Sequence, residues 1–283
     1  MKSSMSSDIK VGIVLPGHTI KADGIFGSFR GTVLCQNGST VPAYIKCNSI
    51  KRITVELFAS KLLEYIGLNT PTPYLVFCPT NVIPEESINV LQRDNAQGLY
   101  INNQWGFYGF ATEELPLPSF KQRIPNSTQL LQPFMELFIE NCSSYVEVIG
   151  FDEWIANGDR NIGNILWDGQ KNFYLIDHGL SMDENYFNQR GNILLTLVVI
   201  TTNPSTQKIS SMFRRALITV DNLDEKMIDT VAAKLKSLQV TEISENVTLL
   251  SSLLKRRLYD AKASLMLKKA SILTKDLFNS SMN

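Results

Sequence analysis

The sequence has few of the residues that common metal and disulfide sites require. Its 283 residues include two histidines, His18 and His178, which is too few for a zinc site built from several histidines. The four cysteines contain no C-x-x-C pair, so buried free thiols are favoured over a zinc knuckle or a disulfide framework. The 27 Lys and Arg residues balance the 27 Asp and Glu residues, so no net charge attracts nucleic acid or an anionic membrane.

Long hydrophobic runs are also missing. The longest apolar stretch, residues 193–200, is far shorter than the roughly 20 residues that span a bilayer. The N-terminal residues lack the apolar segment of a signal peptide. We therefore expect a cytoplasmic protein with no membrane and no direct nucleic-acid partner, and the sequence leaves its oligomeric state open.

The first third of the chain reads as strand-rich. Residues 30–35 and 40–47 predict two strands joined by a turn at Asn37 and Gly38. Apolar spacing over residues 57–66 predicts a helix that ends at Gly67. A short strand is expected over residues 74–77, after the Thr-Pro-Thr-Pro segment.

The rest of the chain reads differently. Repeated prolines and a glycine-rich aromatic stretch predict an irregular segment over 79–133. Residues 132–142 and 144–156 and most of the chain from residue 210 read as helical, with Asp221 or Asp224 as a helix cap. The sequence thus predicts an α+β protein with two lobes, a small strand-rich one over 1–78 and a mostly helical one over 79–283.

The residues that carry chemistry lie between positions 155 and 180. Asp159 lies in a polar turn, and five residues later Asn164 opens the short strand 165–167. A turn at 168–169 leads to a return strand that ends at Asp177. Such a hairpin brings Asn164 and Asp177 to the same end, where amide and carboxylate oxygens are suitable ligands for Mg²⁺. Asp159 is left to accept a hydroxyl proton, as phosphoryl transfer requires.

The N-terminal third contains the other parts that a kinase needs. Lys46 ends the second strand of the hairpin, and Glu56 follows at the start of the next helix. Gly24, Gly27 and Ser28 lie in a glycine-containing turn before both, where a phosphate-binding loop is expected. Taken singly, each has a structural explanation: a solvated lysine, a first-turn glutamate that favours the helix dipole, and glycines that serve only a hairpin.

The spacing D-x-x-x-x-N followed by D-x-G resembles the catalytic and metal-binding loops of protein kinases. More narrowly, residues 151–161 and 175–179, together with the helix 56–68, resemble the HipA-like kinases. These are bacterial serine/threonine kinases distantly related to the phosphoinositide 3/4-kinases. The resemblance covers roughly residues 20–180. It implies a two-lobed protein-kinase-like fold, ATP and Mg²⁺, with Asp159 as the catalytic aspartate, Asn164 and Asp177 as metal ligands, and Lys46 as the nucleotide lysine paired with Glu56.

We therefore expect an ATP- and Mg²⁺-dependent kinase that phosphorylates a protein serine or threonine. A catalytically silent nucleotide-binding regulator, and a small-molecule or lipid kinase, are the alternatives. Retention of the lysine, the aspartate and both metal ligands argues against the silent regulator. His178 is expected to pack or to form hydrogen bonds locally. Ser28 either forms hydrogen bonds within its turn or is itself phosphorylated, and the sequence leaves the acceptor and any toxin or regulatory role open.

Overall fold

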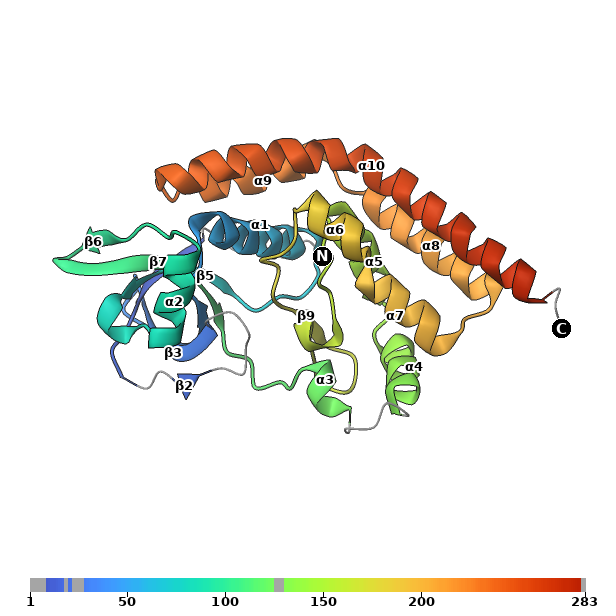
Figure 1. Cartoon of the computed structure of the whole chain (residues 1–283), viewed down its shortest axis with the longest axis horizontal. Coiled ribbons are helices and arrows are strands. Elements are labelled where there is room, and N and C mark those ends of the chain that lie inside the picture. Colours follow the sequence, from blue (N-terminus) through green and yellow to red (C-terminus); the bar gives the residue numbers. More distant parts are fainter. Residues whose placement is uncertain (1–8, 18–19, 22–27, 125–129, 281–283) are drawn as a thin grey trace. The chain divides into compact units, whose positions relative to one another are not determined.

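The computed structural model describes residues 9–17, 20–21, 28–124 and 130–280. Its contacts divide the chain into two compact units, residues 1–116 with 230–249, and residues 117–229 with 250–283. We call these unit 1 and unit 2, and Figure 1 labels their elements. The first boundary falls at residue 116, whereas the sequence predicted one at residue 78. The later boundary arises because β5 (Pro73–Pro79) pairs with a strand that follows residue 78, which makes that segment part of unit 1.

Unit 1 consists mainly of strands. Its elements are β1 (Lys10–Val14), β2 (Ile20–Lys21), β3 (Ser28–Cys35), β4 (Thr40–Lys46), α1 (Ile50–Ile66), β5 (Pro73–Pro79), η1 (Thr80–Val82), α2 (Glu85–Arg93), β6 (Leu99–Ile101) and β7 (Gln104–Glu113). The strands are hydrogen-bonded in the order β1-β5-β7-β4-β3-β2, and β6 pairs with β7. A further antiparallel pairing of β1 with β3 closes five of these strands into a small barrel.

The interior of this barrel is apolar. Side chains from β1, β3, β4, β5 and β7 form one buried cluster that includes Val14, Phe29, Ile45 and Val76. Because side chains alternate along a strand, the residues between these positions lie on the outer face. Helix α1 contacts β5 and β7, and Gly67 ends it in the left-handed conformation with φ of 78°, as the sequence predicted.

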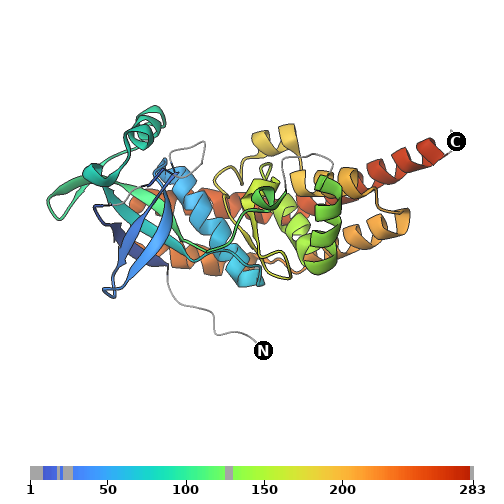
Figure 2. The ribbon, with the colours of Figure 1, turned by 90° about the horizontal axis from the view of Figure 1, so that it is seen from below.

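The segment 79–133 differs most from the sequence-based prediction. It was expected to be irregular, yet it contains α2 and a hairpin of β6 with the ten-residue strand β7, which extends away from the rest of the sheet in Figures 1 and 2. This strand was not predicted because β7 contains glycines, which are uncommon inside strands. A Cβ at Gly106 would lie 2.3 Å from the Cys78 carbonyl oxygen, so glycine is needed there for close backbone approach. Helix α1 also begins earlier than expected, at Ile50.

Unit 2 consists mainly of helices. Its elements are α3 (Phe120–Arg123), α4 (Leu131–Asn141), α5 (Tyr145–Trp154), η3 (Ile162–Asn164), β8 (Ile165–Trp167), β9 (Phe173–Leu175), α6 (Glu184–Arg190), α7 (Ile193–Thr202) and α8 (Thr206–Asp221). Helices α9 (Glu225–Lys236) and α10 (Thr241–Ser280) each contain residues of both units. Asp224, one of the two predicted caps, accepts a hydrogen bond from the Met227 backbone N–H at 2.7 Å.

An aromatic cluster holds the β8–β9 hairpin in unit 2. The ring of Trp167 lies 5.3 Å from that of Phe120 on α3 and 5.5 Å from that of Phe138 on α4, centroid to centroid. Phe138 also contacts Phe173 of β9. Aromatic pairs at such distances contribute to stability beyond the area they bury. The two-stranded hairpin, too small to be stable alone, is thereby fixed on the helices. No helix within the described residues is long and apolar enough to cross a membrane.

Candidate active site

Unit 1 positions the predicted nucleotide lysine through an ion pair. Lys46 ends β4, and its Nζ lies 2.7 Å from Oε1 of Glu56 on α1. The Glu56 side chain is only 3% exposed and that of Lys46 is 18% exposed. The expected pairing of these two residues is therefore confirmed. A charge pair this far buried restricts both side chains more than a surface pair does, so the lysine has a defined position on the outer face of the barrel.

Ser28 lies beside the lysine. In the antiparallel register of β3 and β4, Ser28 is directly opposite Lys46, so both side chains project from the same face of the sheet. On its other side, Lys46 is paired with Phe110 of β7. Gly24 and Gly27, the predicted phosphate-loop glycines, lie outside the described residues. In unit 1, the structure thus brings together Lys46, Glu56 and Ser28.

In unit 2, the loop after α5 forms around Asp159. The backbone N–H of Asp159 donates to the Asn157 side chain at 3.0 Å. Its carbonyl accepts from the Asn161 backbone N–H at 2.7 Å and from Asn164 Nδ2 at 2.7 Å. Asn164 therefore faces the loop through its Nδ2, which leaves Oδ1 as the atom that can bind a cation. The Asp159 carboxylate is partly exposed and lies 3.6 Å from the guanidinium of Arg190 on α6.

The β8–β9 hairpin brings the second carboxylate to this loop. The Ile176 backbone N–H donates to the Asn164 carbonyl at 3.1 Å, so the two strand ends are joined immediately before Asp177. Asp177 adopts φ of 59°, a left-handed conformation that Asp tolerates better than most residues. This conformation turns the chain directly after β9. The structure thus gathers Asp159, Asn164 and Asp177 at one end of the hairpin.

The two carboxylates of this group, those of Asp159 and Asp177, are close enough to affect one another electrostatically. Burial raises the pKa of Asp159 above its usual value, and the negative charge of Asp177 raises it further. Hydrogen bonds from Asn161 and Asn164 and the charge of Arg190 oppose these effects. A divalent cation beside the two carboxylates would relieve their repulsion. Within the described part of the chain, no three His, Cys, Asp or Glu side chains are grouped so that they could hold a metal ion, and the group here offers two carboxylates and one amide.

A buried arginine that sequence reasoning did not assign holds the loop together. Arg160 is fully buried and binds both carboxylate oxygens of Asp152 on α5, with distances of 3.1 and 3.2 Å. Its Nη1 donates to the backbone carbonyls of Asn164 at 3.3 Å and Ile176 at 2.8 Å. Arg160 therefore connects α5 to both strands at the open end of the hairpin. Its place in a polar turn gave no sign of this role, because its partner Asp152 lies eight residues earlier in the sequence.

His178 belongs to the same network. It is buried, and its Nδ1 lies 2.9 Å from Arg160 Nη2. Because a guanidinium only donates, Nδ1 is the acceptor. The expected local hydrogen bonding of His178 is confirmed.

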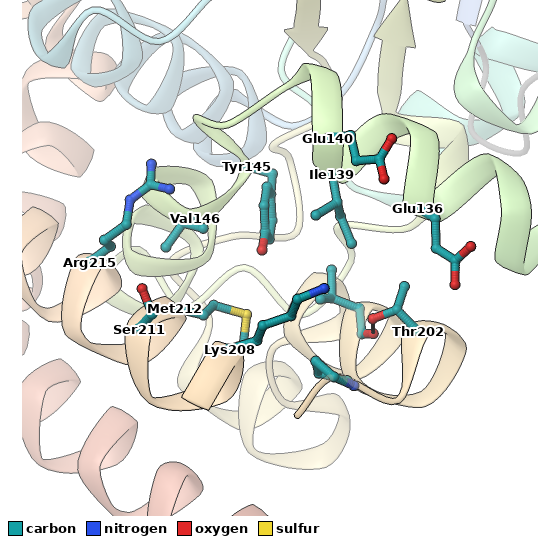
Figure 3. A pocket seen from close by; sticks show the side chains of 12 residues that line it. Glu136, Ile139, Glu140, Tyr145, Val146, Thr202, Lys208, Ser211, Met212 and Arg215 are labelled. Carbon is teal, nitrogen blue, oxygen red and sulfur yellow. Dashed lines mark hydrogen bonds between the residues drawn. The ribbon is translucent and has the colours of Figure 1, made fainter. Parts of the chain in front are cut away.

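A separate cavity of about 310 Å³ also lies in unit 2 (Figure 3). It is formed by α4, α5, α7 and α8, and its lining includes Glu136, Glu140, Lys208 and Arg215. None of the predicted site residues that the structure describes lines it. It is therefore distinct from the group around Asp159.

Comparison with known proteins identifies the family. A family model described as HipA-like kinase matches residues 30–193. No curated protein matches the chain. Among solved structures, the proinflammatory kinase CtkA of Helicobacter pylori is 11% identical, with a TM-score of 0.46 over 84% of this chain and 94% of that one. The Rio2 kinase of Chaetomium thermophilum, in an ADP/Mg²⁺-phosphoaspartate complex, is 13% identical, with a TM-score of 0.40 over 87% of this chain and 71% of that one.

The matched segment begins in β3 and ends at the start of α7, and so contains Lys46, Glu56, Asp159, Asn164 and Asp177. It spans more than half of the 283 residues. The chain belongs to the HipA-like kinase family.

Proposed function

We propose that this protein transfers the γ-phosphoryl group of ATP to a serine or threonine hydroxyl of a protein, with Mg²⁺ as the metal ion. In this proposal, the two units are the two lobes of a protein-kinase-like fold. The observation that carries the proposal is the grouping of the Asp159 carboxylate, the Asn164 amide and the Asp177 carboxylate at one end of the hairpin.

The donor set fits a magnesium ion. The Asp177 carboxylate and the Asn164 Oδ1 are hard oxygen ligands, which Mg²⁺ prefers, and their small number leaves room for phosphate oxygens and water. When bound, the ion would neutralise charge on the phosphates during transfer. Arg160, through the carbonyls of Asn164 and Ile176, keeps the two ligands at a fixed separation.

Asp159 has the role of accepting the proton of the acceptor hydroxyl. Burial and the charge of Asp177 raise its pKa, which makes it a stronger base than an exposed aspartate. Arg190, 3.6 Å away, favours the ionised form that this role needs. Lys46, oriented by Glu56, binds phosphate oxygens of the nucleotide. Ser28 shares its face of the sheet.

The decisive experiment measures ATP turnover with and without Mg²⁺, followed by mass spectrometry of added protein acceptors and of the protein itself. Asp159→Asn should reduce turnover by about 10²–10⁴-fold, the usual contribution of a general base. Asp177→Asn should abolish Mg²⁺-dependent turnover while leaving the fold intact.

Asp168→Asn is the matched control. Asp168 lies in the turn at the other end of the same hairpin and accepts hydrogen bonds from Gln170 and Asn172 on its two oxygens. An asparagine side chain there keeps one of the two acceptor oxygens and removes the charge. This variant should turn over ATP like the parent. Absence of turnover in the parent, or full turnover in Asp177→Asn, would contradict the proposed function.

A further inference from the structure

A large cavity lies within unit 1, away from the residues that the proposed function uses. Its volume is about 870 Å³. One wall is the barrel, where Leu75 and Phe77 alternate with the interior residue Val76 and therefore lie on the outer face. The opposite wall is the turn between α9 and α10, which contributes Leu238 and Val240. Neither Lys46 nor Glu56 lines this space.

Among the described residues, those that line this cavity include no charged side chain. It is formed by aliphatic and aromatic residues together with glycine, and its polar groups are the Gln36 amide, the Ser237 and Tyr108 hydroxyls and the Cys35 thiol. Burial raises the pKa of Tyr108, and the negative charge of Glu242 raises it further. The phenol therefore remains a neutral hydrogen-bonding group at physiological pH.

We propose that this cavity is a binding site for a small, uncharged, largely apolar molecule that carries one or two hydrogen-bonding groups. Small-molecule sites have volumes of about 300–1,000 Å³, mostly apolar walls and a few polar groups that fix orientation, and this cavity has all three features. A charged ligand would lose its hydration here without meeting an opposite charge. The site is independent of the nucleotide and the phosphoryl acceptor.

The cavity of Figure 3 provides a contrast within the same protein. Its walls carry Lys208 and Arg215 on α8 and Glu136 and Glu140 on α4. A neutral apolar molecule would have to displace water from those charged groups, at a cost in free energy. The neutral ligand is therefore expected to select the cavity of unit 1.

A ligand in this site would contact the turn between α9 and α10. Gln239, in the middle of the turn, adopts a left-handed conformation with φ of 58°, which is uncommon for residues other than glycine. Contacts to Leu238 and Val240 on either side would stabilise the turn. Binding should therefore slow amide hydrogen exchange at residues 237–240, because exchange there requires local opening.

The test uses the full chain and the neutral fluorescent dye N-phenyl-1-naphthylamine. We expect one saturable site per chain, with a blue-shifted emission and slower exchange at residues 237–240. Leu238→Glu, which places a charge in the wall, should weaken binding about tenfold or more. Leu238→Trp, which fills part of the cavity without adding charge, should weaken it as well. Thermal melting establishes that both variants are folded.

Leu249→Glu is the matched control. Leu249 belongs to the same unit but is 70% exposed on α10 and does not line the cavity, so this variant should bind the dye like the parent. Equal binding in the parent and both Leu238 variants, equal weakening in Leu249→Glu, or the absence of saturable binding would overturn the proposal. ATP turnover is not a readout, so failure here is distinct from failure of the proposed function.

Cys35 provides a second readout of occupancy. It lines the cavity and is partly exposed, whereas Cys47, Cys78 and Cys142 are buried. Iodoacetamide should therefore alkylate Cys35 first, and the Cys35→Ser variant should lose this labelling. Saturating dye should slow the alkylation of Cys35 in the parent and slow it less in Leu238→Glu. If the dye does not alter the alkylation rate in the parent, the cavity is not where it binds.

Discussion

Replacing Arg160 with methionine tests how the loop around Asp159 is held. Methionine is long and flexible enough to occupy much of the space but has neither the charge nor the hydrogen-bond donors. The variant leaves Asp152 buried without its cation and removes the donors to the carbonyls of Asn164 and Ile176. Removing one partner of a buried ion pair costs about 3–5 kcal/mol. That is a large share of the roughly 5–15 kcal/mol by which a domain is stable.

The loss should depend on pH in a defined direction. Burial already raises the pKa of Asp152, and Arg160 is the strongest influence that lowers it. Without Arg160, the pKa in the folded state rises further above its value in the unfolded chain, so ionised Asp152 destabilises the variant above that folded pKa. The penalty disappears as the pH falls through the folded pKa. The difference in stability between Arg160→Met and the parent should therefore be largest near neutral pH and shrink on acidification.

Urea unfolding and thermal melting, both followed by circular dichroism at several pH values, measure the two effects. At about 2–4 °C per kcal/mol, the melting temperature near neutral pH should fall by roughly 6–20 °C. Arg215→Met is the matched control, because Arg215 is 41% exposed and pairs with Glu147 at 2.8 Å, and surface pairs contribute about 0–1 kcal/mol. If Arg160→Met melts like Arg215→Met, or if its deficit grows on acidification, the reasoning is refuted.

Three further predictions concern the candidate active site. Asp177→Asn should lower the pKa of Asp159, because it removes a neighbouring negative charge; carboxyl ¹³C NMR titration measures this, and an unchanged pKa would contradict their proximity. Lys46→Ala should abolish turnover even at temperatures where the variant is folded, and should cost about 3–5 kcal/mol in stability because it removes the cation paired with the buried Glu56 carboxylate. Glu56→Gln, which keeps an acceptor for the lysine, should retain more activity than Lys46→Ala. If Ser28 is phosphorylated by the protein itself, incubation with ATP and Mg²⁺ should add a phosphate to the peptide 22–30; turnover without this mass shift excludes the modification.

The grouping of Asp159, Asn164 and Asp177 could be predicted from the sequence because these residues are close to one another along the chain. Asn164 and Asp177 belong to a single hairpin, and the turn residues between them specify which strand ends meet. The pairing of Lys46 with Glu56 was also predictable, because only a short connection separates the end of β4 from α1. The family resemblance rested on these same local patterns, and the family model that matches residues 30–193 confirms it.

Long-range contacts decided the rest. The closure of the barrel depends on β1 pairing with both β3 and β5. Strand β7 is stabilised by pairing with β4 and β5. Neither feature could be predicted from a local sequence pattern. Arg160 reads as an ordinary polar residue of a turn, and only the folded chain surrounds it with Asp152 and two backbone carbonyls. The uncharged cavity of unit 1 likewise exists only because the turn near Leu238 packs against a barrel formed more than a hundred residues earlier. Sequence patterns indicate hydrogen bonds and turns among neighbouring residues, whereas burial, which raises the pKa of Asp159, is a property of the whole fold.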